Sequence, residues 1–419
     1  MNLGQNILET VKLANEAKSA LFNLNTELKN EALKNIAISI EENKEKIFEA
    51  NKLDLEVSKK ILEEGKITKA TYDRLKLDEN KMRDMVKGVY DVIKLEDPAN
   101  KVLWARELDE GLVLKKVTSP IGLIAIIFEA RPDVMAQISS LAIKSGNAVI
   151  LKGGKEAENT NKAFYSVIKE ALDKTQGFPK NVVNLVFSHD DIKSILELDE
   201  YIDLIIPRGS NKLVSYIQNN TKIPVLGHAS GICHIFVDEF ATKDMVEKIV
   251  VDAKTQYPSA CNSVETVLVH KNYSYLEELK ICLEKNEVKI VENPEKYDVE
   301  YSDKILTLKV VDSIEEAISH INKYGSGHTD SILTENKENA EKFMMMVDSA
   351  GVYHNASTRF ADGFRYGFGA EVGISTNKTL ARGPVGLDGL CVYKYKLFGS
   401  GQIVNDYAKG IKQFNHKDL

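Results

Sequence analysis

Apolar and helical segments alternate between residues 119 and 206, and this alternation constrains the fold more than any other feature of the sequence. The first apolar segment is almost continuous, as in a strand that is buried on both faces. Helices are predicted from Pro132 to Gly146 and over residues 158–175, with a further short helix before the last strand. This order predicts a parallel, doubly wound sheet. The predicted strands are Ile121–Phe128, Ala148–Lys152, Val182–Phe187 and Ile202–Ile206.

The segments on either side of this region differ from it in pattern. The first hundred residues repeat apolar side chains at helical spacing, and Thr26 is predicted to cap one of these helices. Residues 104–118 alternate polar and apolar side chains around Asp109-Glu110-Gly111, which indicates a hairpin. Strands and helices alternate again from about residue 230, which predicts a second α/β domain. The alternating segment 390–397 predicts one more strand.

Length and charge exclude several classes of protein. The chain has 419 residues, more than the roughly 250–300 that one hydrophobic core accommodates, so we expect two or three domains. Its net charge of −7 argues against a nucleic-acid binder. No apolar run approaches the ~18 residues of a membrane span, and the start of the chain lacks a signal-peptide core. The four cysteines form no CxxC pair, which predicts a reduced, cytoplasmic protein with no metal site.

Cys261 is the strongest candidate for a catalytic residue. It lies on a turn of small residues, Pro258–Ser263, directly before the apolar run Val264–Val269. A thiolate at the mouth of a strand can attack an acyl carbon, and a backbone amide beside it can hold the resulting oxyanion. The alternative is a small buried hydrophobic residue, because free cysteine is among the most buried residue types.

Two segments could bind a dinucleotide, although no G-x-G-x-x-G fingerprint follows a strand. Residues 207–212 follow the fourth strand and open a helix, whose free amides would face a pyrophosphate. The alternative for this segment is an ordinary strand-to-helix turn. Residues 152–155, Lys-Gly-Gly-Lys, end the second strand, where open α/β sheets bind ligands, and the two lysines suit a phosphorylated ribose.

Several blocks of the sequence occur in the same order as in a known superfamily. In the first half of the chain they are Ser119–Gly122, Phe128–Val134, Ile206–Ser210 and Val225–His228. In the second half they are Gly231–His234, Ala260–Ser263, His354–Phe360, Gly369–Val372 and Ala381–Pro384. On these blocks the chain resembles the aldehyde dehydrogenase superfamily over nearly its full length. The resemblance is closest to the branch that reduces L-glutamyl 5-phosphate in proline biosynthesis.

The resemblance implies an aldehyde dehydrogenase-like α/β fold, with two doubly wound domains and a small β oligomerisation element. The implied NADP-binding domain comprises residues 1–103 and 119–229. The catalytic domain comprises residues 230–385, and the oligomerisation strands are residues 104–118 and 390–402. The family's strands pair between subunits, so a homo-oligomer, at least a dimer, is expected. Glutamate 5-kinase is a further candidate partner that the resemblance suggests.

The implied reaction is the NADPH-dependent reduction of L-glutamyl 5-phosphate to L-glutamate 5-semialdehyde, with release of phosphate through a thioacyl intermediate on Cys261. Hydrolytic members of the superfamily carry a water-activating glutamate in a Glu-Leu-Gly-Gly block, and this chain has Val225 at that place. Members selective for NAD carry a glutamate three residues after the lysine that ends the strand. This chain has Lys155 there, which would attract a 2′-phosphate and favours NADPH.

The resemblance also assigns further site residues. Most are placed by the blocks, the two lysines by the end of the second strand, and Glu300 by its distance from Ser313–Glu316. The implied substrate-binding residues are Arg131, Asn262, Arg359 and Arg382. The implied cofactor-binding residues are Lys152, Lys155, Gly209, Ser210 and Glu300. Each arginine could equally hold loops together. The histidines that could act as acids or bases are His228, His234 and His354, of which His234 has the pattern of a core residue.

Two other functions share much of this pattern. A coenzyme-A-acylating aldehyde dehydrogenase also lacks the hydrolytic glutamate, and it would reduce acyl-CoA without any response to phosphate. A catalytically silent relative would keep the fold as a binding or structural protein. The intact block around Cys261 and the presence of Lys152 argue against the silent relative.

Overall fold

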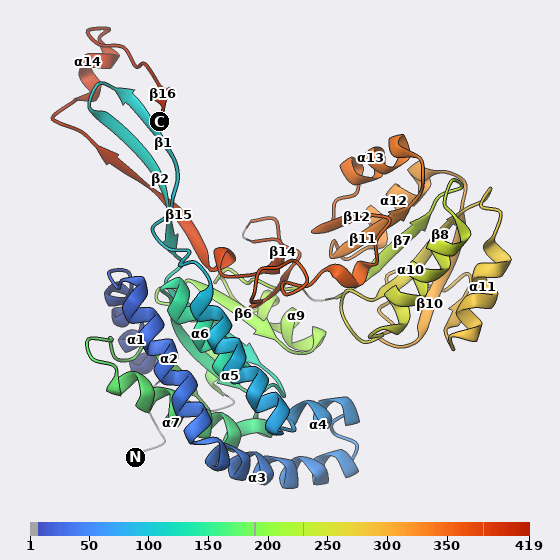
Figure 1. Cartoon of the computed structure of the whole chain (residues 1–419), viewed down its shortest axis with the longest axis horizontal. Coiled ribbons are helices and arrows are strands. Elements are labelled where there is room, and N and C mark those ends of the chain that lie inside the picture. Colours follow the sequence, from blue (N-terminus) through green and yellow to red (C-terminus); the bar gives the residue numbers. More distant parts are fainter. Residues whose placement is uncertain (1–6, 188–189, 229, 380) are drawn as a thin grey trace. The chain divides into compact units, whose positions relative to one another are not determined.

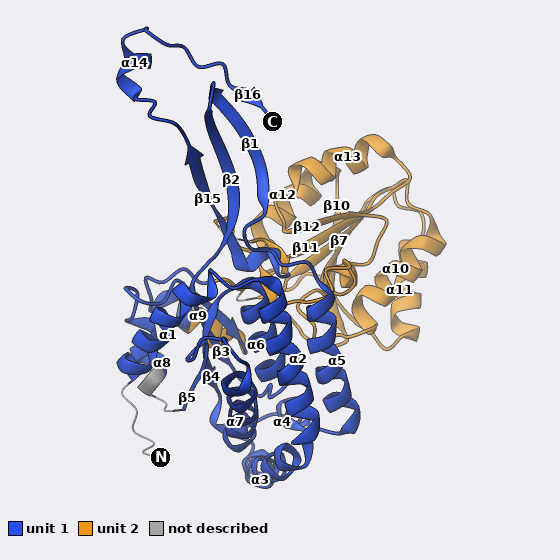
Figure 2. Ribbon diagram, turned by 60° about the vertical axis from the view of Figure 1, so that its left-hand side comes forward, with its two compact units in different colours: residues 1–209, 217–225, 386–419 blue, residues 210–216, 226–385 orange. Residues whose placement is uncertain are grey.

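The chain folds into two compact units (Figure 2). The structure is a computed structural model that describes residues 7–187, 190–228, 230–379 and 381–419. Unit 1 consists of Met1–Gly209, Ile217–Val225 and Gly386–Leu419. Unit 2 consists of Ser210–Tyr216 and Leu226–Val385. The first six residues of the predicted N-terminal domain lie outside the described residues.

A four-stranded parallel sheet forms the centre of unit 1 (Figure 1). Its strand order is β5-β4-β3-β6. All residues of β3 and β4 are buried, because strands rich in isoleucine, valine and leucine suit a sheet that is covered on both faces. The predicted parallel sheet is therefore confirmed. Its strands are β3 (Leu123–Phe128), β4 (Ala148–Gly153), β5 (Val183–Val186) and β6 (Leu204–Arg208).

Helices surround this sheet, and most of them come from the first hundred residues (Figure 2). α1 and α6 contact β4, whereas α2 packs against α5 and α7. The N-terminal helices are α1 (Ile7–Leu21), α2 (Thr26–Glu42), α3 (Lys44–Glu63), α4 (Lys69–Leu75) and α5 (Glu79–Lys94). The later ones are α6 (Val134–Ser145), the 3₁₀ turn η1 (Lys155–Ala157), α7 (Glu158–Lys174) and α8 (Asp190–Leu196). α9 (Asn211–Asn219) follows β6 along the chain.

Two predicted helix boundaries need correction. Thr26 is not the cap of α2: the Oδ1 atom of Asn25 accepts a hydrogen bond from the Leu28 N–H at 2.9 Å, whereas Thr26 donates to Asp97. Asparagine is among the strongest N-cap residues, so the residue before the threonine takes this role. α6 begins two residues after Pro132, and it ends, as predicted, before Gly146, whose φ of 79° suits glycine.

A separate antiparallel sheet projects from the rest of unit 1 (Figure 2). The predicted hairpin forms β1 (Val102–Asp109) and β2 (Leu112–Pro120), which the turn at Glu110 and Gly111 connects. The predicted C-terminal strand, β15 (Cys391–Phe398), pairs with β2 along its whole length. The sheet order is β15-β2-β1-β16, with the short strand β16 (Lys417–Asp418) at the other edge. β15 therefore has no neighbouring strand on its outer side among the described residues.

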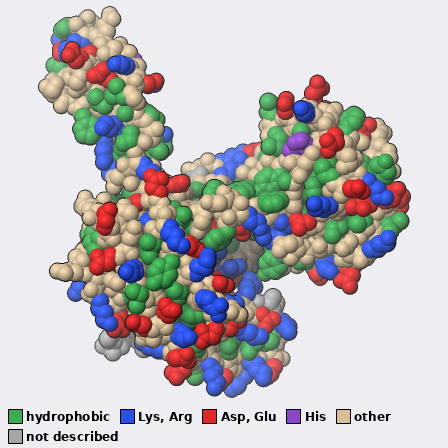
Figure 3. Space-filling view, viewed as in Figure 1, with side chains coloured by type: hydrophobic (Ala, Val, Ile, Leu, Met, Phe, Trp, Pro, Cys, Tyr) green, Lys and Arg blue, Asp and Glu red, His purple; other side chains and the backbone are tan. Residues whose placement is uncertain are grey.

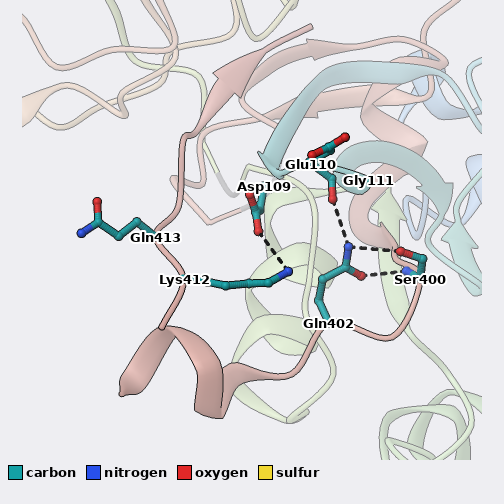
Figure 4. A pocket seen from close by; sticks show the side chains of 7 residues that line it. All are labelled: Asp109, Glu110, Gly111, Ser400, Gln402, Lys412 and Gln413. Carbon is teal, nitrogen blue, oxygen red and sulfur yellow. Dashed lines mark hydrogen bonds and ion pairs between the residues drawn. The ribbon is translucent and has the colours of Figure 1, made fainter. Parts of the chain in front are cut away.

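The C-terminal segment, which includes α14 (Val404–Ala408), folds back onto the hairpin turn. Gln402 donates a hydrogen bond to the backbone carbonyl of Glu110 at 3.1 Å, and Lys412 lies 3.7 Å from the Asp109 carboxylate (Figure 4). An open pocket lies at this junction. It is lined by Asp109, Glu110, Gly111, Ser400, Gln402, Lys412 and Gln413. The lining is polar and charged, and it contains neither a cysteine nor a histidine.

Unit 2 contains a parallel sheet in which the described residues form six strands (Figure 1). Its order is β12-β11-β7-β8-β10-β9, and every neighbouring pair is parallel. The central strands are buried along their whole length, which confirms the second predicted α/β unit. The strands are β7 (Cys233–Val237), β8 (Val264–His270), β9 (Lys289–Val291), β10 (Ile305–Val311), β11 (Thr329–Leu333) and β12 (Gly351–His354).

Four helices of unit 2 connect these strands. They are α10 (Lys243–Thr255), α11 (Leu276–Lys285), α12 (Ile314–Tyr324) and α13 (Lys337–Met346). The glycine-rich tail of the unit holds the 3₁₀ turn η2 (Thr358–Phe360) and a small antiparallel pair, β13 (Gly373–Ser375) and β14 (Gly383–Val385), before η3 (Asp388–Leu390) of unit 1. Among the described residues, no helix is both long enough and apolar enough to cross a membrane.

Candidate active site

Cys261 lies on the turn that joins α10 to β8 in unit 2. Two backbone hydrogen bonds define this turn, from Ala260 N–H to the Tyr257 carbonyl at 3.1 Å and from Ser263 N–H to the Ala260 carbonyl at 2.8 Å. The Cys261 residue is half-buried, whereas the strand that follows it is fully buried. The turn therefore presents the thiol at the mouth of a core strand, as the sequence predicts.

A buried ion pair fixes the two elements that carry this turn. Lys254 at the end of α10 and Glu265 at the start of β8 are both fully buried, and Nζ lies 3.0 Å from Oε2. The backbone N–H of Tyr301 also donates to Oε2. Burial raises the pKa of Glu265 to about 7, although Lys254 opposes this shift, and burial lowers the pKa of Lys254. The pair ties the helix end to the strand start and so restrains both ends of the cysteine turn.

Gly231 lies directly against the cysteine backbone. A Cβ atom at this position would lie 2.1 Å from the carbonyl oxygen of Cys261 and 2.5 Å from its Cα. Both neighbouring atoms belong to the backbone, so no side chain can move aside to make room. The glycine is therefore needed for the close approach of the Gly231 segment to the cysteine turn.

We expect Gly231→Ala to lower kcat by about 100-fold, because an added methyl group must push the Cys261 backbone out of place, and a displacement near 1 Å has effects on that scale. The measurement is steady-state kinetics together with thermal unfolding. Gly88→Ala is the matched control, since a Cβ there meets no atom within 4 Å in α5. A Gly231→Ala enzyme with wild-type kcat would show that the turn can shift without cost to the chemistry.

Two histidines lie beside the thiol. The Cys261 sulphur and one ring nitrogen from each of His228 and His328 all lie within 4.8 Å of one another. The two rings meet edge to face, with centroids 5.1 Å apart. His228 is half-buried and its Nδ1 lies 2.9 Å from the carbonyl oxygen of Ile374. His328 is buried, with Nδ1 at 2.9 Å from the Thr329 hydroxyl, and its Nε2 has no partner among the described residues.

The cysteine turn also offers hydrogen-bond donors. Among the described residues, the backbone N–H groups of Cys261 and Asn262 have no acceptor. The Asn262 side chain is buried and donates to the Ala361 carbonyl at 2.8 Å, while its Oδ1 has no partner in the described part of the chain. Two unused amides beside a thiol can receive the negative oxygen that forms when the thiolate adds to a carbonyl group.

Arg359 is the predicted arginine that the structure brings to the thiol. It is 7% exposed, and its Nε donates to Gln256 at 2.9 Å. Burial lowers the pKa of Arg359, as does the neighbouring Arg365, whereas the negative charge of a Cys261 thiolate acts in the opposite direction. Arg359 and Cys261 are thus close enough to interact electrostatically, and the arginine places a positive charge near the nucleophile.

The other predicted arginines have different surroundings. Arg382 lies in unit 2, and its guanidinium donates to the Asp348 carboxylate at 3.0 Å and to the Asp348 carbonyl at 2.9 Å. This pairing fits the alternative role of the arginine, in which it holds loops together. Arg131 lies in unit 1 between β3 and α6, and its side chain makes no ion pair or hydrogen bond with any described residue.

The predicted cofactor residues of unit 1 lie around the end of β4. Lys152 is buried in the strand, and its Nζ donates to the Gly153 carbonyl at 2.7 Å. Lys155 is exposed at the start of η1, with no ion pair or side-chain hydrogen bond to any described residue. Glu156 accepts a hydrogen bond from the Ala130 N–H at 2.6 Å and lies over Gly154. The carboxylate next to Lys155 is therefore already engaged, whereas the lysine charge is available to a ligand.

The predicted cofactor residues around α9 are also exposed. Gly209 and Ser210 precede the helix, and the Ser210 hydroxyl accepts a hydrogen bond from the Leu213 N–H at 3.3 Å. The backbone N–H groups of Asn211 and Lys212 have no acceptor among the described residues. In unit 2, the Asn211 side chain donates to Glu300 at 2.7 Å. The structure thus places Glu300 beside the first turn of α9.

Three features of the cysteine site were not predicted from sequence: His328, the close approach of Gly231, and the buried Lys254–Glu265 pair. His328 follows Gly325-Ser326-Gly327 at the start of β11, and a histidine that opens a buried strand is a weak signal that could have suggested it. His234 is fully buried beside Asp330, as its core pattern indicated. His354 contacts the Thr334 carbonyl at 2.9 Å.

Comparison with known proteins supports the superfamily resemblance. The model of the aldehyde dehydrogenase family matches residues 4–302. A gamma-glutamyl phosphate reductase of Brachyspira hyodysenteriae is 60% identical over 429 residues, covering 99% of both chains. One from Acetivibrio thermocellus is 53% identical over 419 residues, covering 96% of both chains. The crystal structure of gamma-glutamyl phosphate reductase from Thermotoga maritima superposes with a TM-score of 0.91 at 40% identity, covering 95% of this chain and 99% of that one.

Proposed function

Because the chain belongs to the aldehyde dehydrogenase family, and within it to the gamma-glutamyl phosphate reductases, we propose that it reduces L-glutamyl 5-phosphate to L-glutamate 5-semialdehyde with NADPH in the cytoplasm. The reaction releases phosphate and serves proline biosynthesis. The observation that carries the proposal is the half-buried Cys261 on its small-residue turn, beside backbone amides that have no acceptor among the described residues. The 60% identity to a reductase over nearly the full chain supports the substrate.

The first chemical step is the attack of Cys261 on the acyl carbon. An imidazole near the thiol takes its proton, and we assign this role to His328, because its buried Nε2 has no partner among the described residues. The thiolate forms a C–S bond, and the C–O bond to phosphate breaks, so phosphate leaves with that electron pair. The backbone N–H groups of Cys261 and Asn262 stabilise the negative oxygen of the intervening tetrahedral adduct.

Arg359 supplies positive charge for the anionic substrate. Its guanidinium interacts electrostatically with Cys261, so it is suited to attract the acyl phosphate and to stabilise the phosphate as it leaves. Gln256 and the Tyr257 ring restrain the arginine, with the guanidinium 5.8 Å from the ring centroid. A preorganised cation costs less to align than a mobile one, which favours the transition state.

The residues predicted to bind the cofactor fit NADPH. Lys155 offers a 2′-phosphate a cation that is unpaired within the described part of the chain, and the first amides of α9, which have no acceptor there, suit a pyrophosphate. NADPH, when bound, supplies the hydride that reduces the thioester. Cys261 then leaves as thiolate when the hemithioacetal collapses to the semialdehyde. Val225, a half-buried residue that bridges to Ile205, has no group that could activate water, so the thioester is protected from hydrolysis on that account.

We expect Lys155→Glu to shift the ratio of kcat/KM for NADPH over NADH by at least about tenfold toward NADH, equivalent to about 1.4 kcal/mol, because the new carboxylate repels a 2′-phosphate. Steady-state kinetics with both cofactors measures this ratio. Lys155→Gln should give an intermediate ratio, since it removes attraction without adding repulsion. The control is Lys52→Glu, which changes an exposed lysine on α3. An unchanged ratio in Lys155→Glu would show that Lys155 does not bind the 2′-phosphate.

The projecting sheet of unit 1 supports the proposed homo-oligomer. Its edge strand β15 has no outer partner among the described residues, and its large side chains are more than half exposed at Tyr393, Tyr395 and Leu397. Figure 3 shows hydrophobic side chains along this projecting sheet. An unpaired apolar edge invites uncontrolled association unless another strand covers it, and a second copy of the same strand is the simplest partner.

We therefore expect the protein to sediment as a dimer or larger assembly at micromolar concentration. Leu397→Arg should weaken this assembly, because it places a charge on the exposed face of β15. Leu53→Arg is the matched control: Leu53 is 54% exposed on α3 and Leu397 is 57% exposed. Analytical ultracentrifugation distinguishes the outcomes, and a stable wild-type monomer would contradict the proposed assembly.

The substrate assignment is tested in the oxidative direction against its rival. Purified protein is given NADP⁺ with either glutamate semialdehyde and phosphate, or propionaldehyde and coenzyme A, and NADPH formation is followed by absorbance. The proposal requires turnover with the first pair and little with the second. Efficient oxidation of propionaldehyde that depends on coenzyme A would instead identify a coenzyme-A-acylating aldehyde dehydrogenase.

A further inference from the structure

The three groups that meet at the nucleophile are also a set of metal ligands. We propose that His228, Cys261 and His328 form a binding site for Zn²⁺, through which this cation reversibly blocks the enzyme. The Cys261 sulphur and a nitrogen from each ring lie within 4.8 Å of one another. That Zn²⁺ inhibits rests on the proposed role of Cys261 as nucleophile, whereas binding itself depends only on the geometry of unit 2.

The hydrogen bonds of the two rings prepare them as ligands. The Ile374 carbonyl can only accept, so Nδ1 of His228 carries the proton and Nε2 carries the lone pair. The Thr329 hydroxyl can accept from Nδ1 of His328 in the same way, and Nε2 of that ring is buried without a partner among the described residues. Histidines that bind metal usually donate their second ring N–H to an oxygen in this manner.

The spacing requires only a small contraction. Zn–N bonds of about 2.0–2.1 Å and a Zn–S bond of about 2.3 Å place tetrahedral ligand atoms roughly 3.3–3.6 Å apart. The ligand atoms already lie within 4.8 Å of one another, so side-chain rotations that move each atom by on the order of 1 Å bring them to this spacing. Cys261 and His228 are both half-buried, so solvent reaches the site and water can take the fourth position.

The ligand types select the cation. One thiolate and two imidazoles favour Zn²⁺ over Mg²⁺ or Ca²⁺, which prefer oxygen ligands. The three residues come from separate segments of unit 2, before β7, before β8 and before β11. This explains why the cysteine spacing contains no zinc motif. Binding replaces the S–H bond of Cys261 with an S–Zn bond and releases one proton, so the sulphur lone pair is no longer available for attack on an acyl carbon.

Cobalt(II) is the probe for this site, because a thiolate-to-cobalt charge-transfer band reports the sulphur directly. We expect one Co²⁺ per chain with that band in the wild-type protein, displacement by Zn²⁺, and slower alkylation of Cys261 when Zn²⁺ is present. Cys261→Ser should lose the band. His228→Gln and His328→Gln should each bind at least about tenfold more weakly, on the scale seen when metal-site residues are removed.

The controls separate the site from general thiol or histidine binding. Cys282→Ser and His416→Gln change another free cysteine and an exposed histidine, and both should keep wild-type cobalt affinity. Because His328 is buried, thermal unfolding checks that its variant folds, and the half-buried His228 provides the second test. The proposed metal site would be wrong if the charge-transfer band persisted in Cys261→Ser. It would also be wrong if both histidine variants folded and kept wild-type cobalt affinity.

Inhibition is then measured on the holoenzyme. Zn²⁺ should abolish NADPH formation from glutamate semialdehyde and phosphate, and a chelator should restore it. The two proposals fail separately. Cobalt binding without any reductase activity would support the metal site and contradict the proposed function. Full activity with no cobalt band at Cys261 would support the proposed function and contradict the metal site.

Discussion

Cys261→Ser is expected to lower kcat for the reductase reaction by roughly three orders of magnitude or more, the scale on which loss of the nucleophile acts in enzymes with a covalent intermediate. A serine hydroxyl at this turn keeps the shape of the side chain, but its oxygen stays protonated near neutral pH and attacks an acyl carbon poorly. We expect the surrounding turn to keep its structure, because the Lys254–Glu265 pair that restrains it does not involve the exchanged side chain.

The variant should still bind NADPH, because the residues proposed to hold the cofactor are Lys152, Lys155 and the start of α9 rather than the thiol. Fluorescence titration with NADPH measures this binding beside the kinetics. Cys282→Ser on α11 is the matched control and should keep wild-type kcat. Turnover of Cys261→Ser within tenfold of wild type would contradict the assignment of the nucleophile.

The elements that were predicted well are those whose sequence pattern reflects burial. β3 and β4 are continuous apolar runs that end at glycine or a turn, so their existence and approximate bounds follow from periodicity alone. The hairpin of β1 and β2 follows from alternation around Glu110-Gly111 in the same way. Boundaries were less predictable: the cap of α2 moved by one residue because asparagine and threonine both suit that position.

The candidate site was predictable only where one segment carries the signal. Cys261 stands out because the turn and the following strand are contiguous in sequence. His228 and His328 are a hundred residues apart along the chain, and only the parallel sheet of unit 2 brings them to one thiol. The clash that excludes a Cβ at Gly231 is equally a property of two distant segments. Such relations depend on topology, and no local pattern encodes them.

Oxidation of glutamate semialdehyde by NADP⁺ is expected to depend almost completely on phosphate, or on arsenate as its mimic. In this direction Cys261 forms the thioester, and the acceptor must then break the C–S bond. Val225 stands where hydrolytic members of the family carry their water-activating glutamate, and its side chain cannot deprotonate water. Phosphate is already an anion at neutral pH, so it needs no general base and returns the thioester to the acyl phosphate.

The measurement is the initial rate of NADPH formation with and without phosphate in an otherwise identical buffer, and we expect a ratio of at least about 100, the usual contribution of a general base. Val225→Glu supplies the missing carboxylate and should raise the phosphate-independent rate. Val225→Gln introduces a side chain of nearly the same shape as glutamate but without a base, so it should not raise this rate. Rapid phosphate-independent oxidation by the wild-type protein would identify a hydrolytic aldehyde dehydrogenase. Water would then have another activator, and the reading of Val225 as the residue that preserves the thioester would be wrong.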